Sequence, residues 1–207
     1  MSFASLTRGL FLAAALALLA GAALADPPPA HEPDDMAIGN PRAPVTVIEY
    51  ASVGCPHCAA WHNAVFAPFK AKYVDTGRAR FVVREMLTGA PAIATAGFML
   101  ARCAGPAKYF QVIDAVYHRQ AEMFQPGAHA GQILEDIAKS AGLDEAAFQA
   151  CIGDQKGLDA LNARAQRHVE TDKVDSTPIF FVNGQRYEGE QTLDQLATAI
   201  HAARYGH

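Results

Sequence analysis

Two cysteines separated by two residues, in the segment Cys55-Pro56-His57-Cys58, are the residues of this chain best suited to chemistry. Two thiols at this spacing can close a small disulfide and reopen it without reorganising the fold, or they can bind a soft metal ion. A third interpretation, an inert structural staple, is disfavoured because so short a loop gains little entropy on closure. The motif therefore predicts redox chemistry or metal binding.

The segments on either side place the motif where a strand passes into a helix. Residues Val45 to Ala51 form an apolar, β-branched run, and Ala59 to Tyr73 is compatible with a helix. Cys55 would then stand at the N-terminal end of a helix, where free backbone N–H groups and the helix dipole favour a thiolate. Pro56 suits the first turn, where its missing N–H needs no partner. We expect Cys55 to be the nucleophile and Cys58, one turn further in, to be the more buried resolving thiol.

His57 lies between the two cysteines and can place a hydrogen-bond donor, or a positive charge when protonated, beside the Cys55 sulfur. That interaction would stabilise the dithiol relative to the disulfide, and the disulfide would then be a stronger oxidant. The alternative is an exposed loop histidine with no electronic role.

Two predicted strands carry residues that could serve the same chemistry. Glu49 precedes the motif, and its carboxyl is either on an exposed strand face or buried beneath the cysteines, where it could relay the proton of Cys58. Thr177-Pro178 opens a later strand. It is either an ordinary trans proline or a cis peptide that presents the backbone of Thr177 to a substrate chain beside Cys55.

The predicted elements follow the order strand, helix, strand, then a block of helices, then two strands and a helix. Asn183-Gly184 is a hairpin signal between the last two strands. The pattern indicates an α/β domain with a central mixed sheet and an inserted all-helical subdomain at about residues 90–172. Beyond those named above, strands are expected over Arg80–Glu85, Pro178–Val182 and Gln185–Glu188, and helices over Ala92–Ala104, Ala107–Met123, Gly131–Ala141, Asp144–Ile152, Leu158–Thr171 and Leu193–Arg204.

The first 25 residues are typical of an export signal, with Arg8 in a polar start, an apolar stretch from Gly9 to Leu24, and small residues that suit cleavage before Asp26. An uncleaved membrane anchor is the alternative, although the run is short for a full span and Pro27-Pro28-Pro29 follows directly. We expect a cleaved signal peptide and a periplasmic location.

Residues 26–37, rich in proline and acidic side chains, are expected to form a flexible leader, and residues 38–207 to form one domain. The formal net charge of the whole chain is −4, and it becomes −5 when Arg8 is removed with the signal. This mild acidity gives no electrostatic footprint for nucleic acid or for an anionic membrane surface.

All four cysteines lie in the part expected to be exported, where an oxidising compartment allows disulfides to persist. Local pairing of Cys55 with Cys58 leaves Cys103 and Cys151, both on predicted helices of the insertion, for a structural disulfide. Free buried thiols and a second redox-active pair are the alternatives.

The CPHC motif after VTVIEYA, together with Thr177-Pro178 before IFFVNG, resembles the thioredoxin superfamily. The long helical block between them is similar to that of the DsbA-type periplasmic thiol:disulfide oxidoreductases, in which CPHC is the usual active site. The likeness covers roughly Ile38 to Arg204.

The resemblance implies a thioredoxin fold and a role for each candidate residue. Cys55 would be the exposed attacking nucleophile and Cys58 its buried partner. His57 would be the main residue that tunes the redox potential, and Pro178 would be a cis-proline facing the disulfide. Glu49 matches the buried acid of the family, which favours the proton-relay role.

The expected activity is that of a monomeric dithiol oxidase that donates its Cys55-Cys58 disulfide to cysteines of newly translocated proteins. Reoxidation by a DsbB-like membrane quinone reductase is implied by the resemblance, and no organic cofactor is required. One alternative is a disulfide isomerase or reductase of the same fold, although no added dimerisation domain is visible. Another is a copper-binding or zinc-binding thiol protein that also uses His62, although no second CxxC motif supports a stable zinc site and Ala59 excludes the CxxCH haem motif.

Overall fold

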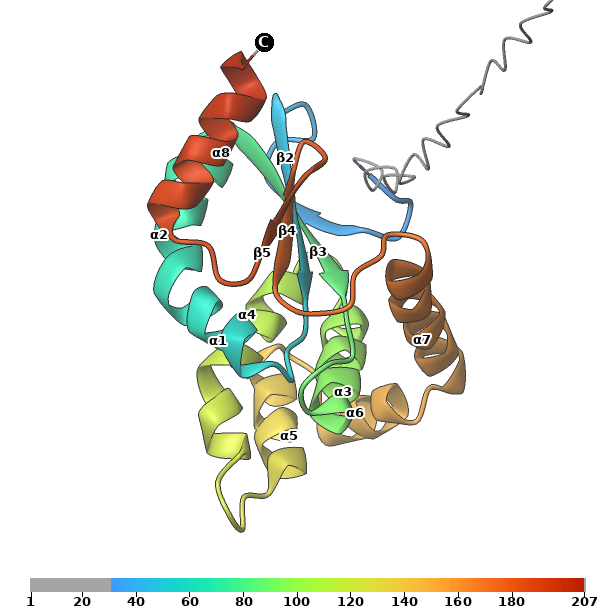
Figure 1. Cartoon of the computed structure of the whole chain (residues 1–207). Helices are drawn as coiled ribbons and strands as arrows, with labels where there is room; N and C mark the ends of the chain where they lie inside the picture. Colours follow the sequence, from blue (N-terminus) through green and yellow to red (C-terminus); the bar gives the residue numbers. More distant parts are fainter. Residues whose placement is uncertain (1–30, 207) are drawn as a thin grey trace, which may run out of the picture.

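The computed structural model describes residues 31–206, and in them a five-stranded mixed sheet is surrounded by helices (Figure 1). The strand order is β1-β3-β2-β4-β5; the pair β2 and β3 is parallel and the other pairs are antiparallel. This arrangement confirms the predicted α/β fold with a central mixed sheet. The strands span Met36–Ile38 (β1), Val45–Ala51 (β2), Ala79–Glu85 (β3), Ile179–Val182 (β4) and Gln185–Glu188 (β5).

Strand β2 lies at the centre of the sheet, and its apolar, β-branched sequence is what a strand covered on both faces requires. Its ladder with β3 begins at Val45 opposite Ala79 and ends at Ala51 opposite Glu85. The chain leaves the carboxyl end of β2 at Ala51 and enters the first helix after a short loop. In open α/β sheets this edge is where ligands and reactive groups gather.

The helix after β2 is one continuous run made of four labelled parts with different hydrogen-bond patterns. Pro68 lies inside this run, where it lacks the N–H that would continue the i→i−4 pattern. The π-helical stretches on either side of it have wider turns. The parts are α1 (Pro56–Trp61), η1 (His62–Phe66), α2 (Ala67–Phe69) and η2 (Lys70–Val74).

The predicted helical insertion is present, and its helices α3 to α6 gather at the end of the sheet where α1 begins (Figure 1). Helix α7 begins at Gln155 rather than at the predicted Leu158, because the Asp154 side chain caps it by accepting from the Lys156 N–H at 3.1 Å. The helices are α3 (Pro91–Cys103), α4 (Tyr109–Met123), α5 (Ala130–Ser140), α6 (Glu145–Ile152), α7 (Gln155–Glu170) and α8 (Leu193–Tyr205). Within residues 31–206, none of the helices has the length and apolar character needed to cross a bilayer.

Trp61 fixes the first helix to the sheet. Its buried ring lies 4.8 Å from the ring of Phe180 in β4 and 6.1 Å from that of Phe81 in β3, measured between centroids. Large aromatic side chains contribute much of the energy of such cores. The position of α1, and of the cysteines at its start, is therefore set by packing against two strands.

The segment from Glu32 to Ile38 belongs to the fold, so the flexible leader expected over residues 26–37 is wrong for its described part, residues 31–37. Strand β1 pairs with β3, and the buried Arg84 guanidinium contacts Asp35 at 3.0 Å and Glu32 at 3.2 Å. The acidic residues look like a solvated tail in the sequence, but two of them are the carboxylate partners that a buried guanidinium requires. The predicted signal peptide (residues 1–25) and residues 26–30 lie outside the described residues.

Candidate active site

The two cysteines of the motif occupy different environments at the start of α1. Cys55 is the N-cap residue, with an extended backbone, and its Sγ lies 3.5 Å from the carbonyl oxygen of Thr177. Cys58 has no exposed surface, and its Sγ accepts from the Ser52 N–H at 3.5 Å. Both are free thiols. Cys55 exposes only 6% of its surface, so it is less open than the exposed nucleophile expected from the sequence.

Two glycines that the sequence analysis did not identify allow the loop before α3 to pack tightly against Cys55. The Ala90 N–H donates to the Gly54 carbonyl at 2.9 Å, and Gly89 adopts a left-handed φ of 74°. A Cβ atom at Gly89 would lie 2.2 Å from the Gly54 carbonyl oxygen and 2.9 Å from the Cys55 Cα. Only glycine fits there. The turn signal Gly89-Ala90 before Pro91 was the one indication in the sequence.

The pKa values of the two thiols move in opposite directions. The pKa of Cys55 is lowered to about 5 by a hydrogen bond from the Cys58 thiol, helped by the Thr177 side chain and by the backbone N–H groups of Cys58 and His57. Burial raises the pKa of Cys58 well above its ordinary value, and the neighbouring Cys55 and Glu49 raise it further. At neutral pH the pair therefore carries one thiolate, on Cys55, and one neutral thiol, on Cys58.

Alkylation of Cys55 in the reduced protein is expected to titrate with a midpoint near pH 5, because the thiolate is the reactive form. The rate with iodoacetamide, read by mass spectrometry at Cys55, should be constant near pH 7 and fall as the pH drops through 5. The unfolded protein is the control, with thiols that titrate near the usual value of about 8.5. Since the folded pKa is depressed, the ionised thiolate also stabilises the reduced protein, and this contribution is lost as the pH falls through about 5. A folded midpoint above pH 8 would contradict the proposed environment.

The His57 side chain contacts the carboxylate of Glu190, a residue that the sequence did not single out. Its Nδ1 lies 2.7 Å from Oε1 of Glu190, in the loop between β5 and α8, and both side chains are exposed. The hydrogen bond with Glu190 raises the pKa of His57, and the charge of Cys55 raises it further. The two residues are 133 positions apart in the chain, so no local pattern could have paired them.

The side chain of Glu49 is buried, which is one of the two positions that the sequence left open for it. Glu49 is 1% exposed and lies in β2 between Val83 of β3 and Phe180 of β4. Burial raises its pKa to about 8, the charge of Cys55 adds to the rise, and Oε1 has no hydrogen-bond partner. A carboxyl that is protonated at neutral pH can give its proton to a nearby thiolate.

Replacing Glu49 with glutamine is expected to change the pH dependence of stability. A folded pKa of about 8 means that the protonated carboxyl contributes stability at pH 4, and that this contribution is lost as the pH rises from 4.5 through 8. Glu49→Gln should therefore be more stable than the unmodified protein at pH 8 in thermal unfolding, with little difference at pH 4. If Glu49 is the proton donor for Cys58, disulfide exchange should also slow by about 10²-fold at pH 7. Equal pH profiles for the two proteins would contradict a buried, titrating carboxyl.

The peptide bond between Thr177 and Pro178 is cis. The Thr177 carbonyl is the group that Cys55 contacts, and the Thr177 hydroxyl lies 2.6 Å from that of Thr88. The Pro178 carbonyl accepts from the Gly189 N–H at 2.9 Å. The start of β4 is thus joined to the loop before α3 and to the loop after β5, with Thr177 beside the reactive sulfur.

The helical insertion contacts the active-site loop directly through Gln120 of α4. The buried Gln120 amide donates from Nε2 to the carbonyl oxygens of Val53 at 2.7 Å and of Cys55 at 3.2 Å. An unsatisfied buried carbonyl costs about 1–3 kcal/mol. The Cys55 carbonyl also accepts from the Ala59 N–H at 3.1 Å, so Gln120 is a second donor to that group. The insertion therefore supplies part of the structure that positions Cys55.

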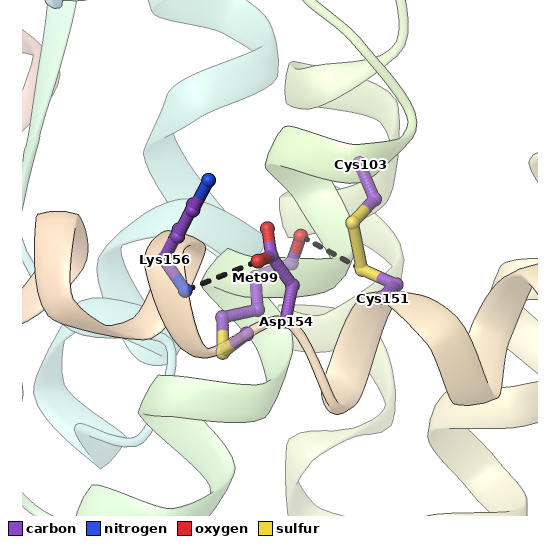
Figure 2. Close-up of a disulfide and its surroundings, with 5 residues drawn as sticks. All are labelled: Met99, Cys103, Cys151, Asp154 and Lys156. Atoms are coloured by element: carbon purple, nitrogen blue, oxygen red, sulfur yellow. Dashed lines mark hydrogen bonds between the residues drawn. A yellow bond between two sulfur atoms is a disulfide. The ribbon is translucent and has the colours of Figure 1, made fainter.

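Cys103 and Cys151 form a disulfide that joins the end of α3 to α6, with Cα atoms 6.1 Å apart (Figure 2). The Cys151 Sγ lies 3.3 Å from the Met99 carbonyl oxygen. Figure 2 also shows Asp154 accepting from Lys156 at the start of α7, which follows α6 directly. The bridge thus lies within the insertion and ties together helices on either side of α4 and α5 in the chain.

His62, the additional metal ligand considered above, lies in a different environment from the cysteines. Its buried imidazole stacks on Phe66 at 4.2 Å between centroids and contacts Asp114 Oδ1 at 3.1 Å, and burial lowers its pKa. Within residues 31–206, one group of three potential metal ligands lies close together: Glu32, His168 and Asp172. The Arg84 guanidinium pairs with both carboxylates of that group and supplies a positive charge there.

The model of a protein family described as thioredoxin matches residues 31–202 of this chain. A relative from Rickettsia felis named "Putative protein-disulfide oxidoreductase" is 32% identical over 170 residues, which cover 82% of this chain and 60% of the relative. The chain thus spans about three fifths of that relative's length.

Solved structures with the same fold include DsbA proteins. The crystal structure of Wolbachia pipientis alpha-DsbA1 matches with a TM-score of 0.78 and 27% identity, covering 84% of this chain and 92% of that one. BdbD from Bacillus subtilis, in its oxidised form, matches with a TM-score of 0.72 over 83% of this chain and 94% of that one. At 18% identity, the second match bears on the fold alone.

Proposed function

Because this chain belongs to the thioredoxin family, in its DsbA-like form, we propose that it is a thiol:disulfide oxidoreductase that donates its Cys55-Cys58 disulfide to protein thiols. The observation that carries the proposal is the asymmetry of the two sulfurs. One has a pKa near 5 at a helix N-terminus, and the other is buried with a raised pKa. From this asymmetry we assign Cys55 as the sulfur that bonds to the substrate and later leaves as a thiolate, and Cys58 as the resolving sulfur.

The reaction begins when a substrate thiolate attacks Cys55 in the Cys55-Cys58 disulfide. A new S–S bond forms between the substrate and Cys55, and Cys58 leaves as a thiolate that takes a proton from Glu49. A second substrate thiolate then attacks the substrate sulfur of this mixed disulfide. The substrate leaves with its own disulfide, having given two electrons to the enzyme, and Cys55 leaves as a thiolate. The cysteines themselves carry the electrons, so the chemistry requires no organic cofactor.

The direction of transfer follows from the stability of the reduced form. A thiol with a pKa near 5 is a good leaving group, and ionisation at neutral pH stabilises the dithiol over the disulfide. The disulfide is then a strong oxidant. This supports an oxidase over the alternative disulfide isomerase or reductase, which must stay reduced to work.

The Thr177 backbone beside Cys55 is the proposed contact for the substrate chain, since an extended peptide can bind to exposed main-chain groups at a strand end. The proposed substrates are reduced or unfolded proteins exported to the periplasm. The proposed route of reoxidation is a DsbB-like membrane quinone reductase acting on a monomer. Export itself is proposed from the apolar N-terminal sequence.

The reduction potential of Cys55-Cys58, measured by equilibration with glutathione buffers, tests the proposal. We expect a value well above the roughly −270 mV of thioredoxin, together with oxidation of a reduced two-cysteine substrate by stoichiometric oxidised enzyme. A potential at or below that of thioredoxin, with efficient insulin reduction, would overturn the oxidase assignment. Stoichiometric copper in the purified reduced protein would favour the metal-binding alternative.

A further inference from the structure

We infer that Glu190 is a positioning residue for the redox chemistry: its carboxylate holds a protonated His57 imidazole next to Cys55. The inference rests on the proposed function and deepens it, because it names a residue outside the Cys-X-X-Cys motif that sets how strong an oxidant the disulfide is.

The contact between the two side chains is short and polar. His57 Nδ1 and Glu190 Oε1 are 2.7 Å apart, the length of a charge-assisted hydrogen bond. The side chains are 75% and 43% exposed, so water and salt screen the pair and its effect is modest. Two charged groups raise the pKa of His57: Glu190, in the loop after β5, and Cys55, at the start of the helix that contains His57.

The loop that carries Glu190 is fixed on both sides of that residue. The Gly189 N–H donates to the Pro178 carbonyl at 2.9 Å, and the Gly189 backbone adopts a left-handed φ of 75°. On the other side, the buried Trp61 indole donates from Nε1 to the Gln191 carbonyl at 2.8 Å. One anchor is the cis-proline strand and the other is the helix of the cysteines. The segment that carries the Glu190 carboxylate is therefore fixed to the two parts of the active site, the Pro178 segment and helix α1.

The consequence for Cys55 passes through His57. A free histidine, with a pKa of about 6.5, is mostly neutral at pH 7, whereas a carboxylate partner favours the imidazolium. A positive charge beside Cys55 stabilises its thiolate and hence the reduced enzyme. Removing the Glu190 charge should then weaken the oxidant at pH 7.

Glu190→Gln tests this inference, with Glu188→Gln as the matched control. Glu188 is an exposed carboxylate two residues earlier, in β5, which pairs with Arg186 at 3.1 Å instead of with His57. Each variant loses one exposed negative charge, Glu188 at the end of β5 and Glu190 in the loop that follows it. The readouts are the glutathione equilibrium at pH 7 and pH 5, and the NMR titration of the His57 imidazole in the reduced protein.

At pH 7, Glu190→Gln should lower the equilibrium constant for reduction of the enzyme by about two- to fivefold, the range of an exposed ion pair. The His57 titration should move to lower pH, and Glu188→Gln should change neither quantity. At pH 5, where the imidazole is protonated in both proteins, the difference should narrow. In a His57→Ala background, Glu190→Gln should have no further effect.

An unchanged His57 titration in Glu190→Gln, or equal shifts in the two glutamate variants, would overturn the inference. A further shift of the equilibrium in the His57→Ala background would also overturn it, because Glu190 would then act without His57. These outcomes are separable from failure of the proposed function, in which the unmodified protein would not oxidise thiols although the His57 titration still responds to Glu190.

Discussion

Cys55→Ser abolishes thiol oxidation, by more than about 10³-fold in rate, if the sulfur at the start of α1 is where the substrate bond forms. Serine is close to cysteine in size and cannot form a disulfide, and the Thr177 carbonyl that Cys55 contacts can accept from a hydroxyl. The fold should therefore persist while turnover is lost. The measurement is oxidation of a two-cysteine peptide by preoxidised enzyme, with thermal unfolding as the check on folding.

Cys58→Ser is the matched control for that experiment, because it makes the same atomic change one turn further into the helix. It should also lose turnover, but its Cys55 thiolate should react with glutathione disulfide and accumulate as a mixed disulfide that no second thiol resolves. Mass spectrometry distinguishes the two variants. Capture of glutathione by Cys55→Ser, and its absence in Cys58→Ser, would reverse the roles assigned to the two sulfurs.

Removal of the Cys103-Cys151 bridge is expected to lower the free energy of unfolding by about 4 kcal/mol, because the cysteines are 48 residues apart and the cross-link restricts a long loop in the unfolded chain. The Cys103→Ala/Cys151→Ala variant should unfold at lower urea concentration. Fluorescence of Trp61, the one tryptophan in the sequence, follows the transition.

The loss of the cross-link can be separated from the loss of the sulfur atoms. In a Cys55→Ser/Cys58→Ser background, the same polypeptide can be unfolded with and without a reductant, so that only the Cys103-Cys151 bond differs. A difference below 1 kcal/mol between the two conditions would show that the bridge contributes little to stability. The presence of the bridge would then need an explanation other than stability.

Periodicity and local signals were enough to predict most of the fold. The apolar run before the motif became β2 with unchanged ends, and Asn183-Gly184 became a hairpin in which both residues have positive φ, as its turn type requires. The position of Cys55 at a helix start was also predictable, because Pro56 marks the first turn. These features depend on neighbours in the chain.

The features that could not be predicted depend on partners distant in sequence. The Met36–Ile38 strand is short and follows an acidic, proline-rich stretch, and its position becomes clear only when β3 and Arg84 are placed beside it. Gln120 and Glu190 carry no local signal, since each acts on the active-site segment across a large separation in the chain. The residues before the family resemblance left the burial of Glu49 open for the same reason: β3 and β4, which flank it in the sheet, both come later in the sequence.

The contacts of Gln120 have a consequence for modularity. The order of elements along the chain suggests a simple deletion, in which a short linker replaces residues 90–172 and leaves the thioredoxin-like core. That deletion would remove a donor to the Val53 carbonyl and one of the two donors to the Cys55 carbonyl, together with the helices. The shortened protein would keep every residue of the Cys55-Pro56-His57-Cys58 motif but lose contacts that orient it. The insertion and the motif therefore have to be transferred to another protein together, as one unit.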